Sequence, residues 1–335
     1  MIKGFQHIGL GVSDIERSSA FYRKTLGFRL KINDHEEEMH QMVPVIGELC
    51  RMRVIMAINL SGGAAIELVQ HTGSKPLPLP EARWGDIGFL AMGVKAYRLD
   101  EVVRILKERG ADFVTPIMDV EAGGGETWRS AFIRDPDGLP VELLETAELR
   151  KAGGKPRTGG FSHVAIGVSD MEKAVPFYRD ILGYDSMVFD RDEHPEGLEE
   201  VTGGVRHRSV MLKRSRVPRG GLPVEGGMVM LVQARGLEVK PLFEGRRWGD
   251  VGIMEMALDV ERIHQAYAEA VKGGAAEFCE PTYMDMGSGS VGYFSYVKDP
   301  DGNTVELVEV LKLGFLPPAL IAPLLSGALK IRARL

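Results

Sequence analysis

Two carboxylates stand inside short apolar runs of this 335-residue chain, each after the same tight turn. Glu142 lies in "FIRDPDGLPVELLET" and Glu306 lies in "YVKDPDGNTVELVEV". A third carboxylate, Glu255, has Met254 and Met256 as its neighbours in "GIMEMALDV". A charge in an apolar strand is costly unless it is paired or binds a cation. These glutamates are therefore candidates for metal ligation or for proton transfer.

The chain contains an internal repeat, so these residues recur at matching places. "FQHIGLGVSDIERSSAFYRKTLGF" (residues 5–28) matches "FSHVAIGVSDMEKAVPFYRDILGY" (161–184). "RWGDIGFLAMGV" (83–94) matches "RWGDVGIMEMAL" (247–258) at the same spacing as the two Asp-Pro-Asp-Gly turns. A charged, Gly-rich stretch at residues 148–160 separates the two copies. Each glutamate alone has an ordinary structural explanation, and it is the recurrence that indicates a site.

Each copy divides again into two similar halves. A half begins with an alternating strand, continues with a helix that Gly ends, and finishes with three strand-like runs. In the first half of each copy, Ser-Asp caps the helix. The unit is βαβββ, and the chain contains four such modules. This pattern predicts an α+β fold with domains at residues 1–150 and 158–312 and an apolar tail at 313–335.

The helix motif "FYRxxLG" and the strand motif "DPDGxxxE", in this order, resemble the vicinal oxygen chelate superfamily over about residues 3–310. That superfamily includes glyoxalase I, methylmalonyl-CoA epimerase, fosfomycin-resistance proteins and extradiol dioxygenases. The resemblance implies that two modules form one half-open, cup-shaped barrel around a divalent metal. We expect the modules of each copy to share a barrel, which gives two barrels in the chain.

The resemblance also implies where ligands lie, namely in the first and last strands of each module. Counting five residues back from a Val-like position gives His7, Phe89, His163 and Glu255 in the first strands. The last strands contribute Glu67, Glu142, Met230 and Glu306. The expected set of the first barrel is His7, Glu67 and Glu142, with Phe89 in the fourth place. The expected set of the second barrel is His163, Glu255 and Glu306, with Met230 in the fourth place.

We prefer the second barrel as the working site. Extradiol enzymes of the superfamily use the positions that His163, Glu255 and Glu306 occupy, and their Tyr is matched by Tyr296, where the first barrel has Phe132. One imidazole with two carboxylates favours Mn²⁺ or Fe²⁺, with Zn²⁺, Co²⁺ or Ni²⁺ also compatible. In catalysis we expect Glu255 to act as the base and Tyr296 to donate a hydrogen bond to the developing oxyanion.

Three functions remain open. The first is a metal-dependent isomerase, epimerase or lyase of the glyoxalase type, which stabilises an enolate of a small oxygenated substrate. The second is an extradiol-type dioxygenase, although Glu255 replaces the second His and no catalytic His precedes Tyr296. The third is a metal-free protein that binds small molecules.

Composition excludes other classes. A net charge of −6 without a basic run lacks the electrostatic footprint of a nucleic-acid-binding protein. The two cysteines have no paired spacing, and no signal peptide is visible, so we expect a cytoplasmic protein. The apolar tail is interrupted by prolines, so we expect it to pack on the body or on a second copy in a homodimer, and not to enter a membrane. The paired Trp84 and Trp248 indicate packing, and residues 190–221 are a candidate lid.

Overall fold

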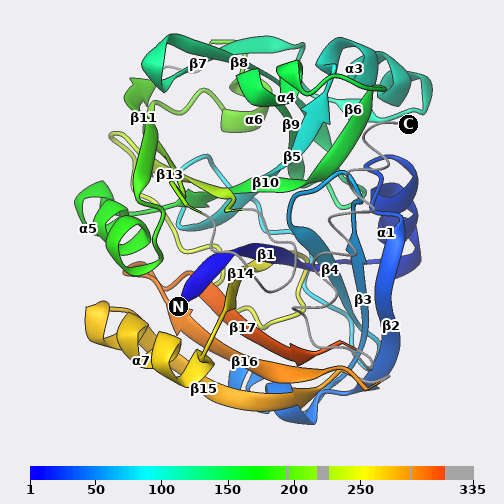
Figure 1. Cartoon of the computed structure of the whole chain (residues 1–335), viewed down its shortest axis with the longest axis vertical. Helices are drawn as coiled ribbons and strands as arrows, with labels where there is room; N and C mark the ends of the chain where they lie inside the picture. The colour runs from blue at the N-terminus through cyan, green and yellow to red at the C-terminus, as the bar shows by residue number, and fades with distance from the viewer. Residues whose placement is uncertain (194–195, 217–225, 287–288, 314–335) are drawn as a thin grey trace.

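A computed structural model of the chain describes residues 1–193, 196–216, 226–286 and 289–313. It confirms the α+β fold of four βαβββ modules in two half-open sheets (Figure 1). The first module comprises β1 (Ile2–Gly11), α1 (Ile15–Lys24), β2 (Leu30–Glu38), η1 (His40–Met42), α2 (Val43–Ile46), β3 (Arg51–Ile58) and β4 (Ala65–His71). The second comprises β5 (Gly88–Tyr97), α3 (Leu99–Glu108), β6 (Asp112–Phe113), β7 (Met118–Ala122), η2 (Gly123–Gly125), β8 (Glu126–Arg134) and β9 (Pro140–Glu145).

A short helix, α4 (Ala147–Lys151), leads into the second half of the chain. The third module comprises β10 (Arg157–Gly167), α5 (Met171–Pro176), η3 (Phe177–Ile181), β11 (Ser186–Glu193), α6 (Glu199–Thr202), β12 (His207–Lys213) and β13 (Met228–Ala234). The fourth comprises β14 (Gly252–Val260), α7 (Ile263–Gly273), β15 (Ala276–Asp285), β16 (Val291–Lys298) and β17 (Thr304–Lys312). In the described part of the chain, no helix has the length and apolar character needed to cross a bilayer.

The sheets do not pair the modules as expected from the sequence. Sheet A has the strand order β15-β16-β17-β14-β1-β4-β3-β2 and therefore joins the first and fourth modules. Sheet B has the order β11-β12-β13-β10-β5-β9-β8-β6, with β7 paired to β8, and joins the second and third modules. The expectation that the two modules of one copy share a barrel was wrong. The division of the sequence at 1–150 and 158–312 stays a prediction, and the predicted tail lies almost wholly outside the described residues.

The segment between the copies fits this exchange. It places the start of β10 antiparallel to the end of β5, with Arg157 opposite Tyr97. It also brings Gly160 against sheet A, where its N–H donates to Gly62 O and a Cβ on Gly63 would lie 2.5 Å from the Gly160 carbonyl carbon. The four modules present similar strand edges, so the repeat itself leaves the partner open. The linker lies in contact with both sheets and is compatible with the pairing observed.

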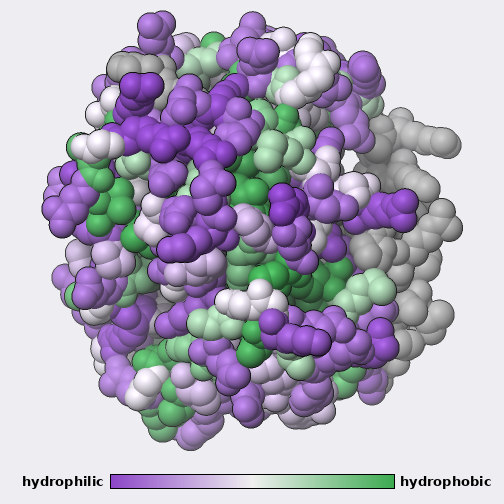
Figure 2. Space-filling view, turned by 90° about the vertical axis from the view of Figure 1, so that its left-hand side faces the viewer, coloured by the Kyte–Doolittle hydropathy of each residue, from purple (hydrophilic) through white to green (hydrophobic). Residues whose placement is uncertain are grey.

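The core lies behind the concave faces of both sheets. Helices α1, α3, α5 and α7 pack against the strands, and one cluster of buried apolar side chains runs through all four modules. Figure 2 shows that hydrophilic side chains cover most of one face, with apolar patches near the middle, at the height where the sheets meet. The shared core indicates that the two sheets form one folded unit.

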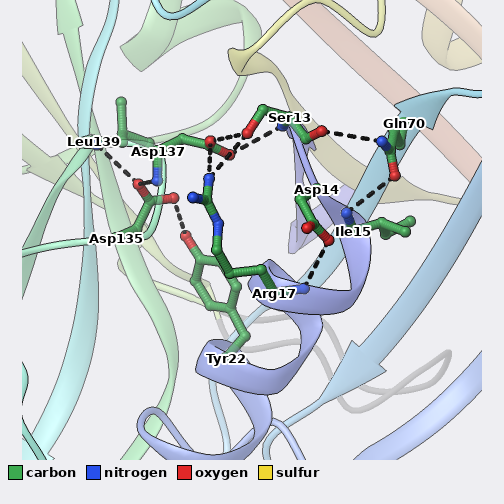
Figure 3. A network of polar contacts seen from close by, with 9 residues as sticks. All are labelled: Ser13, Asp14, Ile15, Arg17, Tyr22, Gln70, Asp135, Asp137 and Leu139. Atoms are coloured by element: carbon green, nitrogen blue, oxygen red, sulfur yellow. Dashed lines mark hydrogen bonds and ion pairs between the residues drawn. The ribbon is translucent and has the colours of Figure 1, made fainter.

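The Asp-Pro-Asp-Gly turns connect modules that do not share a sheet (Figure 3). Asp137 accepts from the Ser13 N–H at 3.1 Å and from Arg17 Nη2 at 2.7 Å, at the start of α1. Asp135 accepts from the Tyr22 hydroxyl at 3.0 Å and from two backbone N–H groups of its own turn. Burial is the main reason why the pKa of Asp135 is raised to about 6. The turn of the second module thus holds the helix of the first.

The second half repeats this contact. Asp301 accepts from the Ser169 N–H at 3.0 Å, and Asp299 accepts from the Tyr178 hydroxyl at 3.0 Å. Strand pairing therefore links modules one with four and two with three, whereas the turns link one with two and three with four. Each module is held by two different neighbours, which closes the four into a ring.

We predict that Tyr22→Phe lowers the free energy of unfolding at pH 8 by about 2 kcal/mol, because the buried, ionised Asp135 loses a donor. Tyr184→Phe is the matched control: Tyr184 is also fully buried, but its hydroxyl has no hydrogen-bond partner among the described residues. Urea denaturation at pH 8 measures both. Equal losses in the two variants would contradict the bracing role of Asp135.

Candidate metal centre

One imidazole and three carboxylates meet on the concave face of sheet A. They come from the four adjacent strands β17, β14, β1 and β4, in the order Glu306, Glu255, His7 and Glu67. His7 is opposite Ala257, which pairs with Glu306, whereas Gly9 pairs with both Glu255 and Glu67. This register brings together side chains that are up to 299 residues apart in the sequence.

A carboxylate oxygen of each glutamate lies within 4.0 Å of His7 Nε2. His7 Nε2 is 3.2 Å from Glu306 Oε2, 3.8 Å from Glu67 Oε2 and 4.0 Å from Glu255 Oε1. A Cβ on Gly9 would lie only 2.4 Å from Glu255 Oε1, so glycine is required where this side chain crosses β1. His7, Glu67 and Glu255 form a group of ligand atoms that could hold one ion.

A β-bulge at Met254 directs Glu255 into the cup. Gly9 pairs with Glu255 but Leu10 pairs with Ile253, so Met254 is the extra residue. The same irregularity in sheet B pairs Ala165 with Ala91 and Ile166 with Phe89. The residue equivalent to Glu255 is therefore Ala91. Phe89, which counting from the sequence placed in the cup, lies in the common core instead. The count started from Val94, whose equivalent in the repeat is Leu258, whereas the equivalent of Val260 is Ala96, five residues after Ala91.

Polar atoms in the cluster lack partners. His7 Nε2, Glu255 Oε1 and Glu306 Oε2 are buried and make no hydrogen bond among the described residues. His7 Nδ1 lies 2.9 Å from Gln6 Oε1, which selects the tautomer with the proton on Nδ1 and leaves the Nε2 lone pair facing the carboxylates. Buried polar atoms are normally satisfied. One nitrogen and three carboxylates around a common point thus fit a divalent cation.

The carboxylates of the cluster are difficult to ionise. The pKa of Glu67, of Glu255 and of Glu306 is raised to about 8, mainly by burial, with the neighbouring carboxylates contributing for Glu67 and Glu255. The buried Tyr296 lies beside Glu255 and Glu306, and its hydroxyl acts against these shifts by lowering both pKa values. The predicted catalytic pair Glu255 and Tyr296 is thus adjacent to the cluster's unpartnered atoms.

Trp248 orients Glu255, a contact that the sequence did not reveal. Its Nε1–H donates to Glu255 Oε2 at 2.6 Å, which leaves Oε1 directed at His7. From the sequence, the repeated "RWGD" indicated only packing. The one available signal was that Trp248 precedes the strand carboxylate Glu255 by seven residues. In sheet B, Trp84 Nε1 is buried and has no partner among the described residues. That donor lacks an acceptor because Ala91 takes the place of Glu255.

The cup of sheet B keeps only half of the set. His163 Nε2 lies 2.9 Å from Glu142 Oε2, and His163 Nδ1 lies 3.0 Å from Ser162 Oγ. Met230, Ala91 and Phe132 stand where sheet A has Glu67, Glu255 and Tyr296.

The structure therefore corrects the grouping of the candidate ligands. His163 is separated from Glu255 and Glu306, and Glu142 is separated from His7 and Glu67, because the barrels exchange modules. His7, Glu67, Glu255 and Glu306 lie together instead. Of the candidate lid, residues 194–195 and 217–221 lie outside the described part of the chain.

We predict that Trp248→Phe weakens divalent-metal binding by about 10-fold to 100-fold, because Glu255 loses the donor that fixes its orientation. Trp84→Phe, the equivalent change in sheet B, should leave metal affinity unchanged. Competition with a chelator measures both variants. A comparable loss in Trp84→Phe would contradict the role assigned to Trp248.

We also predict that metal affinity rises from pH 6 to pH 8.5. The metal-free carboxyls have a pKa of about 8 and hold protons at pH 6, which a cation must displace. Metal uptake near pH 6.5 should therefore release protons, and calorimetry in buffers of different ionisation enthalpy detects them. A pH-independent affinity without proton release would show that the carboxylates do not bind the ion.

Comparison with known proteins agrees with this architecture. The sequence profile of the Glyoxalase/Bleomycin resistance protein/Dioxygenase superfamily matches residues 4–143 and again residues 160–307. The protein YwkD of Bacillus subtilis (strain 168), described as uncharacterized, is 30% identical over 145 residues, which are 43% of this chain and 98% of that protein. The lactoylglutathione lyase of Schizosaccharomyces pombe is 22% identical over 317 residues, which are 90% of this chain and 95% of that enzyme.

Solved structures show the same fold. Glyoxalase I from Zea mays aligns with a TM-score of 0.59 at 18% identity and covers 92% of both chains. A putative dioxygenase from Bacillus subtilis aligns with a TM-score of 0.56 at 14% identity and covers 98% of this chain and 96% of that one. At these identities the likeness concerns the fold alone. The family profile matches two consecutive segments that together make up most of this chain. The chain therefore belongs to the Glyoxalase/Bleomycin resistance protein/Dioxygenase superfamily.

Proposed function

We propose that this chain is a metal-dependent isomerase or lyase of the glyoxalase type with one working site, in the cup of sheet A. The observation that carries the proposal is the cluster of His7, Glu67, Glu255 and Glu306 with three buried, unpartnered ligand atoms. These four side chains would hold the ion, and Mn²⁺ or Fe²⁺ suits one imidazole with carboxylates. A bound divalent ion would polarise the carbonyl or hydroxyl oxygens of a small substrate as a Lewis acid.

The chain's own residues would move the proton. Glu255 is the candidate base and would serve in that role when its Oε1 is not bound to the ion. Oε1 has no hydrogen-bond partner among the described residues, and Trp248 fixes the other oxygen of the same carboxylate. It would take a proton from the carbon next to the carbonyl, and the electron pair of that C–H bond would pass to the carbonyl oxygen. Tyr296 would donate a hydrogen bond to the oxygen on which this charge develops. Return of the proton to the neighbouring carbon would complete an isomerisation without any net oxidation.

The alternatives draw less support from this site. A ring-cleaving dioxygenase of the extradiol type would use two imidazoles and one carboxylate, whereas this cluster has one imidazole and three carboxylates. A metal-free binding protein would leave three buried carboxyl groups facing one another without a counter-charge, which is a costly arrangement. The lactoylglutathione lyases among the relatives favour isomerase or lyase chemistry over these two alternatives.

We predict that the purified protein binds one divalent ion per chain and that Glu306→Gln removes most of it. Glu142→Gln is the matched control, since it changes the equivalent residue of the other cup. In D₂O, the wild type should incorporate deuterium next to the carbonyl of α-hydroxy ketones, as NMR detects. Glu306→Gln should lower this rate by at least 100-fold, because it removes a ligand of the ion.

Two outcomes would overturn the proposal. The first is that Glu142→Gln loses as much metal as Glu306→Gln. The ion would then not be bound specifically in the cup of sheet A, as proposed here. The second is a metal-loaded wild type that exchanges no substrate hydrogen but consumes oxygen with catechols, which would establish the dioxygenase instead.

A further inference from the structure

A cavity of about 290 Å³ is lined by Trp248, Met254, Lys298 and Thr304, each of which is a sequence neighbour or contact of a residue at the metal cluster. Two strands lead from the cluster into it: Lys298 follows Tyr296 by two residues in β16, and Thr304 precedes Glu306 by two residues in β17. Residues two apart in a strand face the same side, about 7 Å from each other. The cavity therefore continues the cup beyond the cluster and lies within reach of a small molecule bound there.

Trp248 connects the two spaces. Its indole lines the cavity, and its Nε1–H donates to Glu255 in the cluster. Met254 also lines the cavity and directly precedes Glu255 at the bulge. A molecule in the cavity would consequently touch the residues that orient a candidate metal ligand.

About half of the residues that line the cavity are apolar. Val45 and Ile46 of α2 close one side, and Phe278 of β15 closes another. Trp248, Met254, Phe278 and Ile46 pack in one cluster with Tyr296. Pockets of this size and lining bind small organic molecules, with the few polar groups setting orientation.

Two cations face this apolar space without a carboxylate partner among the described residues. The Lys298 ammonium lies 4.0 Å from the centre of the Phe278 ring. Arg246 donates from Nη2 to the carbonyls of Pro78 at 2.8 Å and Val251 at 3.0 Å, and its buried Nε has no partner. The neighbouring Arg247 differs, since it pairs with Glu48 and donates to Ser74.

The acidic residues of the wall do not neutralise these cations. Asp301 is occupied by the N–H and the hydroxyl of Ser169, and Glu244 is exposed to solvent. An anion that brought its own apolar body into the cavity would pair with Lys298 and Arg246 and would be screened from water.

We propose that this cavity binds the far end of the substrate, and that the substrate is an apolar acid: a ring or short chain with a carboxylate at one end and adjacent oxygens at the other. This rests on the proposed function, in which those oxygens meet the ion held by His7, Glu67, Glu255 and Glu306. Lys298 is the specificity residue that recognises the carboxylate, and the apolar wall selects against polar peptide conjugates.

Calorimetry on the metal-loaded protein tests this with 4-phenylbutyrate, its neutral counterpart 4-phenylbutanol, and an S-alkyl glutathione. We expect the wild type to bind 4-phenylbutyrate at least 10-fold more tightly than either other probe. Lys298→Met should weaken 4-phenylbutyrate about 10-fold and leave 4-phenylbutanol unchanged. Lys272→Met, at an exposed lysine of α7, is the control and should change neither.

Each contrary result has a distinct meaning. No preference for the carboxylate over the alcohol, or unchanged affinity in Lys298→Met, overturns the assigned role of Lys298. Tighter binding of the glutathione conjugate overturns the substrate class. Metal content, measured on the same samples, separates these results from a failure of the proposed function. If the wild type holds no metal but still binds 4-phenylbutyrate through Lys298, the proposed metal-dependent activity is refuted and the proposed anion-binding site is retained.

Discussion

The main constraint on this structure is the burial of three carboxylates and one imidazole on a single concave sheet face. Carboxylates in such a place repel one another and lose their hydration, so each has a pKa near 8 without a cation. The rest of the site is arranged around them. Gly9 leaves space for Glu255, the bulge at Met254 turns it inward, and Trp248 fixes one of its oxygens.

Two sets of contacts keep the four strands of the site in register. The seam between β1 and β14 joins the first and last modules of the chain, and the Asp-Pro-Asp-Gly turns tie α1 and α5 to the other module of the same half. Because each module is held by two neighbours, the ligands of one cup can come from opposite ends of the sequence. The two turns that precede the strands of Glu142 and Glu306 therefore stabilise the fold, and they also position these two glutamates in the cups.

The second cup shows what the first depends on. It has the same strands, the same turn and a matching His–Glu pair, but Ala91, Met230 and Phe132 replace two ligands and the tyrosine. Within the described ranges, the indole N–H of its Trp84 has no acceptor. The loss of three polar side chains thus converts a candidate metal centre into a mostly apolar interior in which one histidine pairs with one glutamate.

The sequence by itself determined the module, its fourfold repetition, the α+β class and the identity of the polar residues that enter the cups. Those features are local: turn residues, caps and strand patterns act over a few neighbouring positions. Which modules share a sheet was decided only in the tertiary structure, because four similar modules offer similar strand edges. The contact from Trp248 to Glu255 also required it, since the spacing of two residues does not show that an indole N–H reaches a carboxylate. The equivalence of Ala91 and Glu255, by contrast, is already contained in the repeat of residues 83–94 and 247–258.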